Sequence, residues 1–124
     1  MQRGQKDTAR KIVYGAFEIL AKEGDPVIIF DEALANVEPQ VEVRSRRVGG
    51  ANYQVPREVN PGRKMSLAYR WIIQAAQSKK GKPMMEKLAN ELLAARKGEG
   101  EAVAKRDNTH KMAEANKAFA HFAW

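Results

Sequence analysis

The segment from Val41 to Val59, VEVRSRRVGGANYQVPREV, constrains the fold most, because the hydrophobic period changes there from about 3.6 residues to about two. Valine alternates with polar side chains in VEVRS, and the alternation resumes in NYQVP after Gly49-Gly50. Glycine adopts positive φ without a steric penalty, so the two runs are predicted to pair as a β-hairpin around these glycines. An isolated two-stranded hairpin is marginal in water, so this one needs support from helices at its base or from a bound ligand.

The remaining segments show helical periodicity. Asp25-Pro26 and Asn60-Pro61 are each typical of a helix start, with an N-cap residue followed by proline at the first helical position. The first two helices are expected to pack as an antiparallel pair. The fold class is therefore mainly α, a small bundle of about five helices with a protruding two-stranded β-ribbon arm at 41–59. The helices are predicted from about 7 to 22, from 26 to the proline at 39, from 61 to the loop at 78–82, from 83 to 96 and from 101 to the C-terminus.

The length and composition set limits on domain number and location. A chain of 124 residues is enough for one modest core, so residues 1–124 are predicted to form a single domain. The absence of cysteine rules out disulfides and thiolate metal sites and suits a reducing compartment. No apolar run reaches membrane-spanning length and no signal-peptide core follows Met1, so neither a membrane partner nor secretion is expected.

The net charge of +7 is unevenly distributed along the chain. Residues 1–40 carry 5 basic and 7 acidic side chains, a net charge of −2. Residues 41–70 carry 7 basic and 2 acidic side chains, and residues 71–124 carry 10 and 6, for net charges of +5 and +4. A basic centre on a near-neutral helical body is typical of a nucleic-acid binder. A basic protein whose charge serves only solubility is the alternative that charge alone leaves open.

The arm carries the most specific candidate contacts. Arg44, Arg46 and Arg47 can neutralise phosphates or fork onto base edges, the first two from one face of the ribbon and Arg47 from the turn. Glycines at the tip let the backbone approach a polyanion closely. Tyr53 is suited either to stacking on a base or to cross-strand packing. A merely solvated surface hairpin is the alternative.

The helix that follows the arm adds two further candidates. Arg63 and Lys64 lie in its first turn, where the helix dipole favours acidic rather than basic side chains. This mismatch indicates that the two cations serve a partner. Trp71 lies on the apolar stripe of the same helix, so it is predicted to anchor the core rather than to stack on a base.

No catalytic, metal or cofactor site is predicted. The only histidines, His110 and His121, are separated by about 16 Å on one helix at about 1.5 Å per residue, too far to share a metal. His110 is expected to be either a hydrogen-bonded helix residue or an RNA contact. Gly49-Gly50 matches neither phosphate-binding glycine motif, and no helix opens after it.

Three long strings resemble bacterial-type small-subunit ribosomal protein seven: NVEPQVEVRSRRVGGANYQVP, LAYRWIIQAA and AVAKRDNTHKMAEANKAFAHFAW. The likeness covers the chain from about Gly4 to Trp124. It implies a non-enzymatic helical domain with a β-ribbon arm, which binds small-subunit ribosomal RNA as a primary binder and nucleates assembly of the head, the 3′ major domain. The implied neighbours are exit-site tRNA, mRNA at its exit path and small-subunit ribosomal protein eleven, in a cytoplasmic ribosome of bacterial or organellar type.

The resemblance assigns the RNA grip to the arm motif SRRVGG-x-YQVP, to the start of the next helix and to the basic part of the last helix. Together with Arg57, the implied RNA-binding residues are Arg44, Arg46, Arg47, Gly49, Gly50, Tyr53, Gln54, Arg63, Lys64, Arg70, Lys105, Arg106, His110 and Lys111.

The chain departs from the family pattern in three places. The family normally has a basic arm and a first helix ahead of the region where Met1 stands here, so RNA contacts are expected to be missing and apolar surface to be uncovered. Arg57 replaces the apolar residue usual after Val-Pro and is expected either to add a phosphate contact or to weaken packing at the ribbon base. Ala123, in HFAW, replaces a cation.

The sequence therefore predicts a structural RNA-binding protein that captures RNA electrostatically and then docks on its folded shape. An architectural protein that binds double-stranded DNA through the same arm is the first alternative. It would need a dimer to clamp a duplex, and the sequence offers no obvious self-complementary apolar face. A helical protein-interaction module with incidental charge is the second alternative, and it predicts binding almost independent of salt.

Overall fold

The computed structural model describes residues 6–122, with the side chains of residues 6–120. Five helices and one two-stranded antiparallel sheet are present in this range, as predicted. The order is α1 (Lys6–Leu20), α2 (Pro26–Val37), β1 (Val41–Val48), β2 (Ala51–Glu58), α3 (Pro61–Ser78), α4 (Met84–Arg96), α5 (Glu101–Ala115) and the 3-10 helix η1 (Lys117–Phe122). Ala123 and the region before residue 6, on which two of the predicted departures fall, lie outside the described residues.

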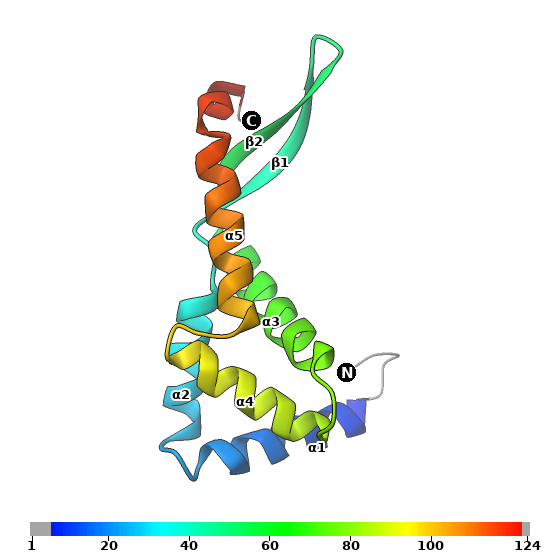
Figure 1. Ribbon diagram of the computed structural model, residues 1–124, viewed down its shortest axis with the longest axis vertical. Helices are drawn as coiled ribbons and strands as arrows, with labels where there is room; N and C mark the ends of the chain where they lie inside the picture. Colours follow the sequence, from blue (N-terminus) through cyan, green and yellow to red (C-terminus); the bar gives the residue numbers. More distant parts are fainter. Residues whose placement is uncertain (1–5, 123–124) are drawn as a thin grey trace.

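A helical body and a projecting arm make up the molecule (Figure 1). Helices α1 to α4 form the body, and α5 rises from it beside the ribbon of β1 and β2. Helix α4 packs against each of the other three body helices. No helix within residues 6–122 is both long enough and apolar enough to span a bilayer.

The helix starts follow the predicted capping chemistry. Oδ1 of Asp25 accepts a hydrogen bond from the Val27 N–H at 3.0 Å, with Pro26 at the first helical position of α2. Oδ1 of Asn60 likewise accepts from the Arg63 N–H at 2.9 Å at the start of α3. These side chains satisfy backbone donors that a helix terminus otherwise leaves unpaired, so local sequence sets both boundaries.

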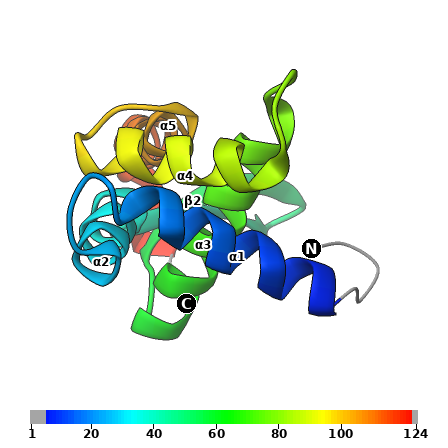
Figure 2. The same ribbon diagram turned by 90° about the horizontal axis from the view of Figure 1, so that it is seen from below.

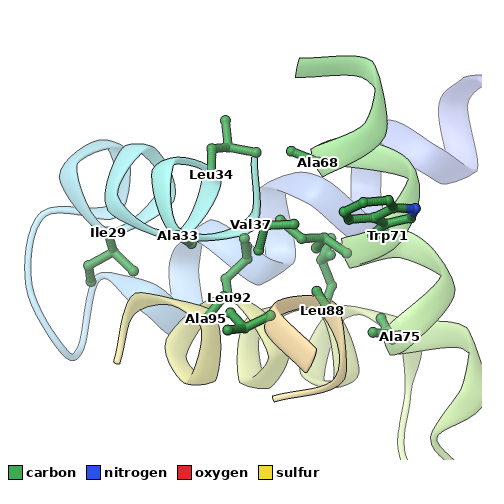
Figure 3. Close-up of a cluster of buried hydrophobic side chains, with 14 of the residues drawn as sticks. Ile29, Ala33, Leu34, Val37, Ala68, Trp71, Ala75, Leu88, Leu92 and Ala95 are labelled. Carbon is green, nitrogen blue, oxygen red and sulfur yellow. The ribbon is translucent and has the colours of Figure 1, made fainter. Parts of the chain in front are cut away.

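The core lies where α2, α3 and α4 face one another (Figure 3). The predicted stripe of α3 is buried, and Trp71 is only 7% exposed, which confirms its role as a core anchor. Leu92, on α4, is 1% exposed at the centre of the cluster. Burial of these side chains fixes the positions of α3, which follows the arm in the chain, and of α4, which precedes α5.

Two details of the predicted helices are wrong. Helix α2 does not return along α1 but runs steeply across it, and both pack mainly against α4 (Figures 1 and 2). The last helix ends at Ala115, because Nδ2 of Asn116 donates to the Met112 carbonyl at 2.8 Å and its N–H bonds the carbonyls of Met112 and Ala113. The chain then tightens into η1.

The body also exposes apolar side chains. Tyr14 is 64% exposed, Val27 57% and Met65 48%. Between α1, α2 and α3 the ring of Phe30 lies 6.1 Å from that of Tyr69, in a groove of about 230 Å³ with apolar walls.

Candidate nucleic-acid interface

The arm ends in a two-residue turn at Gly49 and Gly50. Their φ angles are +58° and +84°, a region that other L-residues adopt only at a cost of about 1–2 kcal/mol. The pair Val48 and Ala51 closes the ladder behind them. A Cβ at either glycine would meet no atom within 4 Å, so backbone conformation rather than space requires glycine here. The tip is therefore open to a ligand.

One face of the arm, called the inner face here, turns toward α5 and η1. It carries Arg44 opposite Val55 and Arg46 opposite Tyr53. Val55 is completely buried, and the Tyr53 ring lies 5.2 Å from the Phe119 ring of η1, with 46° between the planes. The Tyr53 ring thus packs on η1, with Phe119 as the partner, and stacking on a base stays a prediction. Arg44 and Arg46 share a face, as predicted.

The opposite face of the arm is called the outer face, and toward the tip, from Ser45 and Gln54 outward, it is exposed and polar. Arg47 lies on it opposite Asn52, and both side chains are exposed. Nε2 of Gln54 donates to Oγ of Ser45 at 2.9 Å across the ladder. Arg47 was predicted at the turn, but it belongs to β1, because the strand continues to Val48. The arm thus offers arginine on both faces.

Glu42 organises the base of the arm. Its side chain is 10% exposed, and its Oε1 accepts from Nε of Arg63 at 2.8 Å while Nη1 of Arg44 lies 3.9 Å away. The hydrogen bond that Arg63 donates to Glu42 raises the pKa of the Arg63 guanidinium above its usual value. The cation that conflicts with the helix dipole of α3 therefore has a partner inside the chain, and Glu42 ties the arm to that helix.

Gln40 joins the arm to α5 and α3. Its N–H donates to Nε2 of His110 at 3.0 Å. Its side-chain Oε1 accepts from Nζ of Lys64 at 2.8 Å, and its carbonyl accepts from the Val59 N–H at 3.1 Å. His110 is therefore a hydrogen-bonded helix residue, the first of its two predicted roles.

The cations in the first half of α5 also have partners within the protein. Nζ of Lys105 donates to Oε1 of Gln74 on α3 at 2.9 Å. Arg106 donates to the Asn36 carbonyl at the end of α2, where a cation complements the helix dipole. Its Nη2 also lies 2.7 Å from Oδ1 of Asp107, and this hydrogen bond lowers the pKa of that carboxyl. Arg106 therefore holds α5 against the body.

The remaining predicted cations are spread over a wider surface. Arg57 stands opposite Glu42 in the ladder and is half-buried. Arg70 is exposed on α3, about two turns along the helix from Arg63, and Lys111 is exposed on α5. The structure thus brings together the residues of the arm and its base, whereas Arg70 lies on α3 and Lys105 on the first half of α5.

Sequence reasoning missed three residues that organise this surface: Glu42, Gln40 and Phe119. The alternation in VEVRS places Glu42 with Arg44, but nothing local identifies that face as the packed one. Phe119 gives no signal, because its partner belongs to a distant segment. Across residues 6–120, no group of three His, Asp or Glu side chains is arranged to hold a metal ion.

Comparison with known proteins gives consistent matches along the chain. The family model described as ribosomal protein S7p/S5e matches residues 1–117. A protein from Thermotoga petrophila, named small ribosomal subunit protein uS7, is 56% identical over 126 residues, which cover 100% of this chain and 81% of the relative. Proteins of the same name from Rhodopirellula baltica and Fervidobacterium nodosum are 57% and 58% identical and are covered to 82% and 81% of their lengths.

Proposed function

Because the chain belongs to the ribosomal protein S7p/S5e family, we propose that it is an RNA-binding structural constituent of the small ribosomal subunit. The observation that carries the proposal is the arm, a narrow ribbon with Arg44 and Arg47 exposed on opposite faces and two glycines at its tip. Such a ribbon can neutralise phosphates of two RNA segments at once, because guanidinium groups fork onto phosphate oxygens on either side.

The cations divide into two functional groups. Arg63 and Arg106 are held by Glu42 and by the end of α2, so their main effect is to fix the geometry of the arm and of α5. The exposed Arg44, Arg47 and Lys111 meet the RNA phosphates. RNA affinity therefore depends mainly on the exposed cations. The orientation of the arm and of α5 depends on the cations that are paired within the protein.

The finer role follows the resemblance. The RNA is the head of the small subunit, its 3′ major domain, and binding orients RNA helices there so that later proteins can join. The arm tip reaches toward exit-site tRNA and the mRNA exit path, and small-subunit ribosomal protein eleven is a neighbour. The ribosome is a cytoplasmic one of bacterial type, in accordance with the bacterial relatives. The role is structural, not enzymatic.

Binding measurements test this proposal directly. The full chain is titrated with a labelled transcript of the 3′ major domain, and fluorescence anisotropy follows the complex over a series of salt concentrations. We expect affinity to fall steeply as salt concentration rises. The slope of log affinity against log salt concentration should have a magnitude of about 0.7 to 0.9 per phosphate neutralised. Unlabelled duplex DNA serves as the competitor.

The two alternatives predict different results. An architectural DNA-binding protein would lose the transcript to duplex DNA at equal concentration. A protein-interaction module would show weak RNA binding that barely changes with salt. Either result would reject the ribosomal assignment, whereas retention of the transcript with a steep salt slope supports it.

A further inference from the structure

The arm is supported at its base and again further out. At its base, Glu42 bonds Arg63 and Val55 is fully buried. Further out, the Tyr53 ring packs on Phe119. In the described part of the chain this sheet has only two strands, and such a ribbon is marginal in water without packing partners.

The contact between Tyr53 and Phe119 shortens the unsupported part of the arm. From Tyr53 to the start of β2 at Ala51 the strand spans about 7 Å, at about 3.3 Å per residue, and only the turn lies beyond it. Counted from Val55 instead, the length would be about 13 Å by the same measure. Arg47 lies beyond the Tyr53 contact, so its direction depends on where the support ends, whereas Arg44 lies beside the buried Val55 at the base.

Resting on the proposed RNA-binding function, we propose that Phe119 is a positioning residue. Through Tyr53, η1 splints the arm and fixes the direction in which its arginines meet RNA. A pre-oriented arm loses less conformational freedom on binding than a swinging one, so affinity is higher without any additional contact to RNA. Phe119 itself needs no contact with the ligand.

Substitution of Phe119 tests the splint, with RNA affinity and arm orientation measured separately. Phe119→Ala removes the ring, and Phe119→Leu keeps apolar bulk as the conservative control. Affinity is measured for the 3′ major domain transcript. Arm orientation is measured as an electron-spin distance between labels at Asn52→Cys, on the arm, and Asp31→Cys, on α2. Both positions are exposed, and the chain has no cysteine of its own.

We expect Phe119→Ala to broaden the distance distribution and to weaken RNA binding about two- to tenfold, the change that corresponds to about 0.5–1.5 kcal/mol for an aromatic pair. The salt slope should not change, because no phosphate contact is removed. Phe119→Leu should recover most of both properties. Helical circular dichroism shows that the variants keep their fold.

The decisive comparison uses a background that lacks the two exposed arm arginines. In Arg44→Ala/Arg47→Ala, the further change Phe119→Ala should cost much less RNA affinity than in the wild type, because the exposed side chains whose direction the arm sets are absent. An equal loss in both backgrounds, or a distance distribution as narrow as in the wild type, would overturn the proposal. If the wild-type chain fails to bind the transcript, the proposed function is rejected, and the distances still decide whether Phe119 holds the arm.

Discussion

Glu91 is a fully buried carboxylate on α4, and it links α4 to the loop after α3 and to the start of α5. Its Oε1 accepts from the Ala102 N–H at 3.0 Å, in place of the side-chain cap that Gly100 cannot give to α5. Its Oε2 lies 2.9 Å from Nζ of Lys79, in the loop after α3, without the geometry of an aligned hydrogen bond. The contact with Lys79 is therefore mainly ionic.

Removal of Lys79 should destabilise the fold strongly, because Glu91 then remains buried without its counter-charge. Loss of one partner of a fully buried pair costs about 3–5 kcal/mol. The Lys79 side chain is 34% exposed, and water screens that part, so we expect about 2–3 kcal/mol for Lys79→Met. For a chain of this length, the melting temperature should fall by about 6–15 °C.

A double-mutant cycle isolates the ionic contact. In the Glu91→Met background, Lys79→Met should cost about 0–0.5 kcal/mol, because the exposed part of the lysine has no buried charge to serve. Lys80→Met is the matched control, since this neighbouring lysine is exposed, and it should change stability by less than about 0.5 kcal/mol. Chemical and thermal unfolding, followed by circular dichroism, measure the stability of the two single variants, the double variant and Lys80→Met. Additive costs for Glu91 and Lys79 would refute the reasoning.

Two further predictions concern local contacts. Asn60→Ala should destabilise α3 by about 1 kcal/mol, because the Arg63 N–H loses its cap, whereas Asn60→Ser should retain most of the stability in denaturant titrations; equal losses would contradict this. Because the hydrogen bond from Arg106 lowers the pKa of Asp107, this carboxylate stabilises the fold above its unfolded pKa and the effect is lost as pH falls through the folded value. Arg106→Gln should therefore raise the titration midpoint of Asp107 in carboxyl NMR, and an unchanged midpoint would refute the pairing.

Local sequence predicted the features that depend on local chemistry. The change of period and Gly49-Gly50 gave the hairpin and its turn, because strand alternation and positive φ are properties of neighbouring residues. Asp25-Pro26 marked the start of α2 for the same reason. The pattern of apolar residues also identified the buried face of α3, because one periodic stripe determines which side of a helix meets the core.

Contacts between distant segments could not be predicted in this way. Glu42 alternates as a solvent-facing residue would, yet it is buried because Arg63 reaches it from the next helix. Arg63 in the first turn of α3 conflicts with the helix dipole, and this conflict indicated that it has a partner. The sequence alone did not identify Glu42 as that partner. The contact of Tyr53 with Phe119 depends on where α5 ends, and the predicted end of that helix was wrong.

The most direct test of the central claim is the salt dependence of RNA binding with and without the exposed arm arginines. Arg44→Ala/Arg47→Ala is compared with Lys11→Ala/Lys22→Ala, which removes the same charge from exposed positions in and just after α1. We predict that the arm variant binds the 3′ major domain transcript more weakly and loses about 1.4–1.8 from the magnitude of the salt slope, while the control keeps the wild-type slope. An unchanged slope in the arm variant, or an equal loss in the control, would contradict the claim that the arm grips RNA.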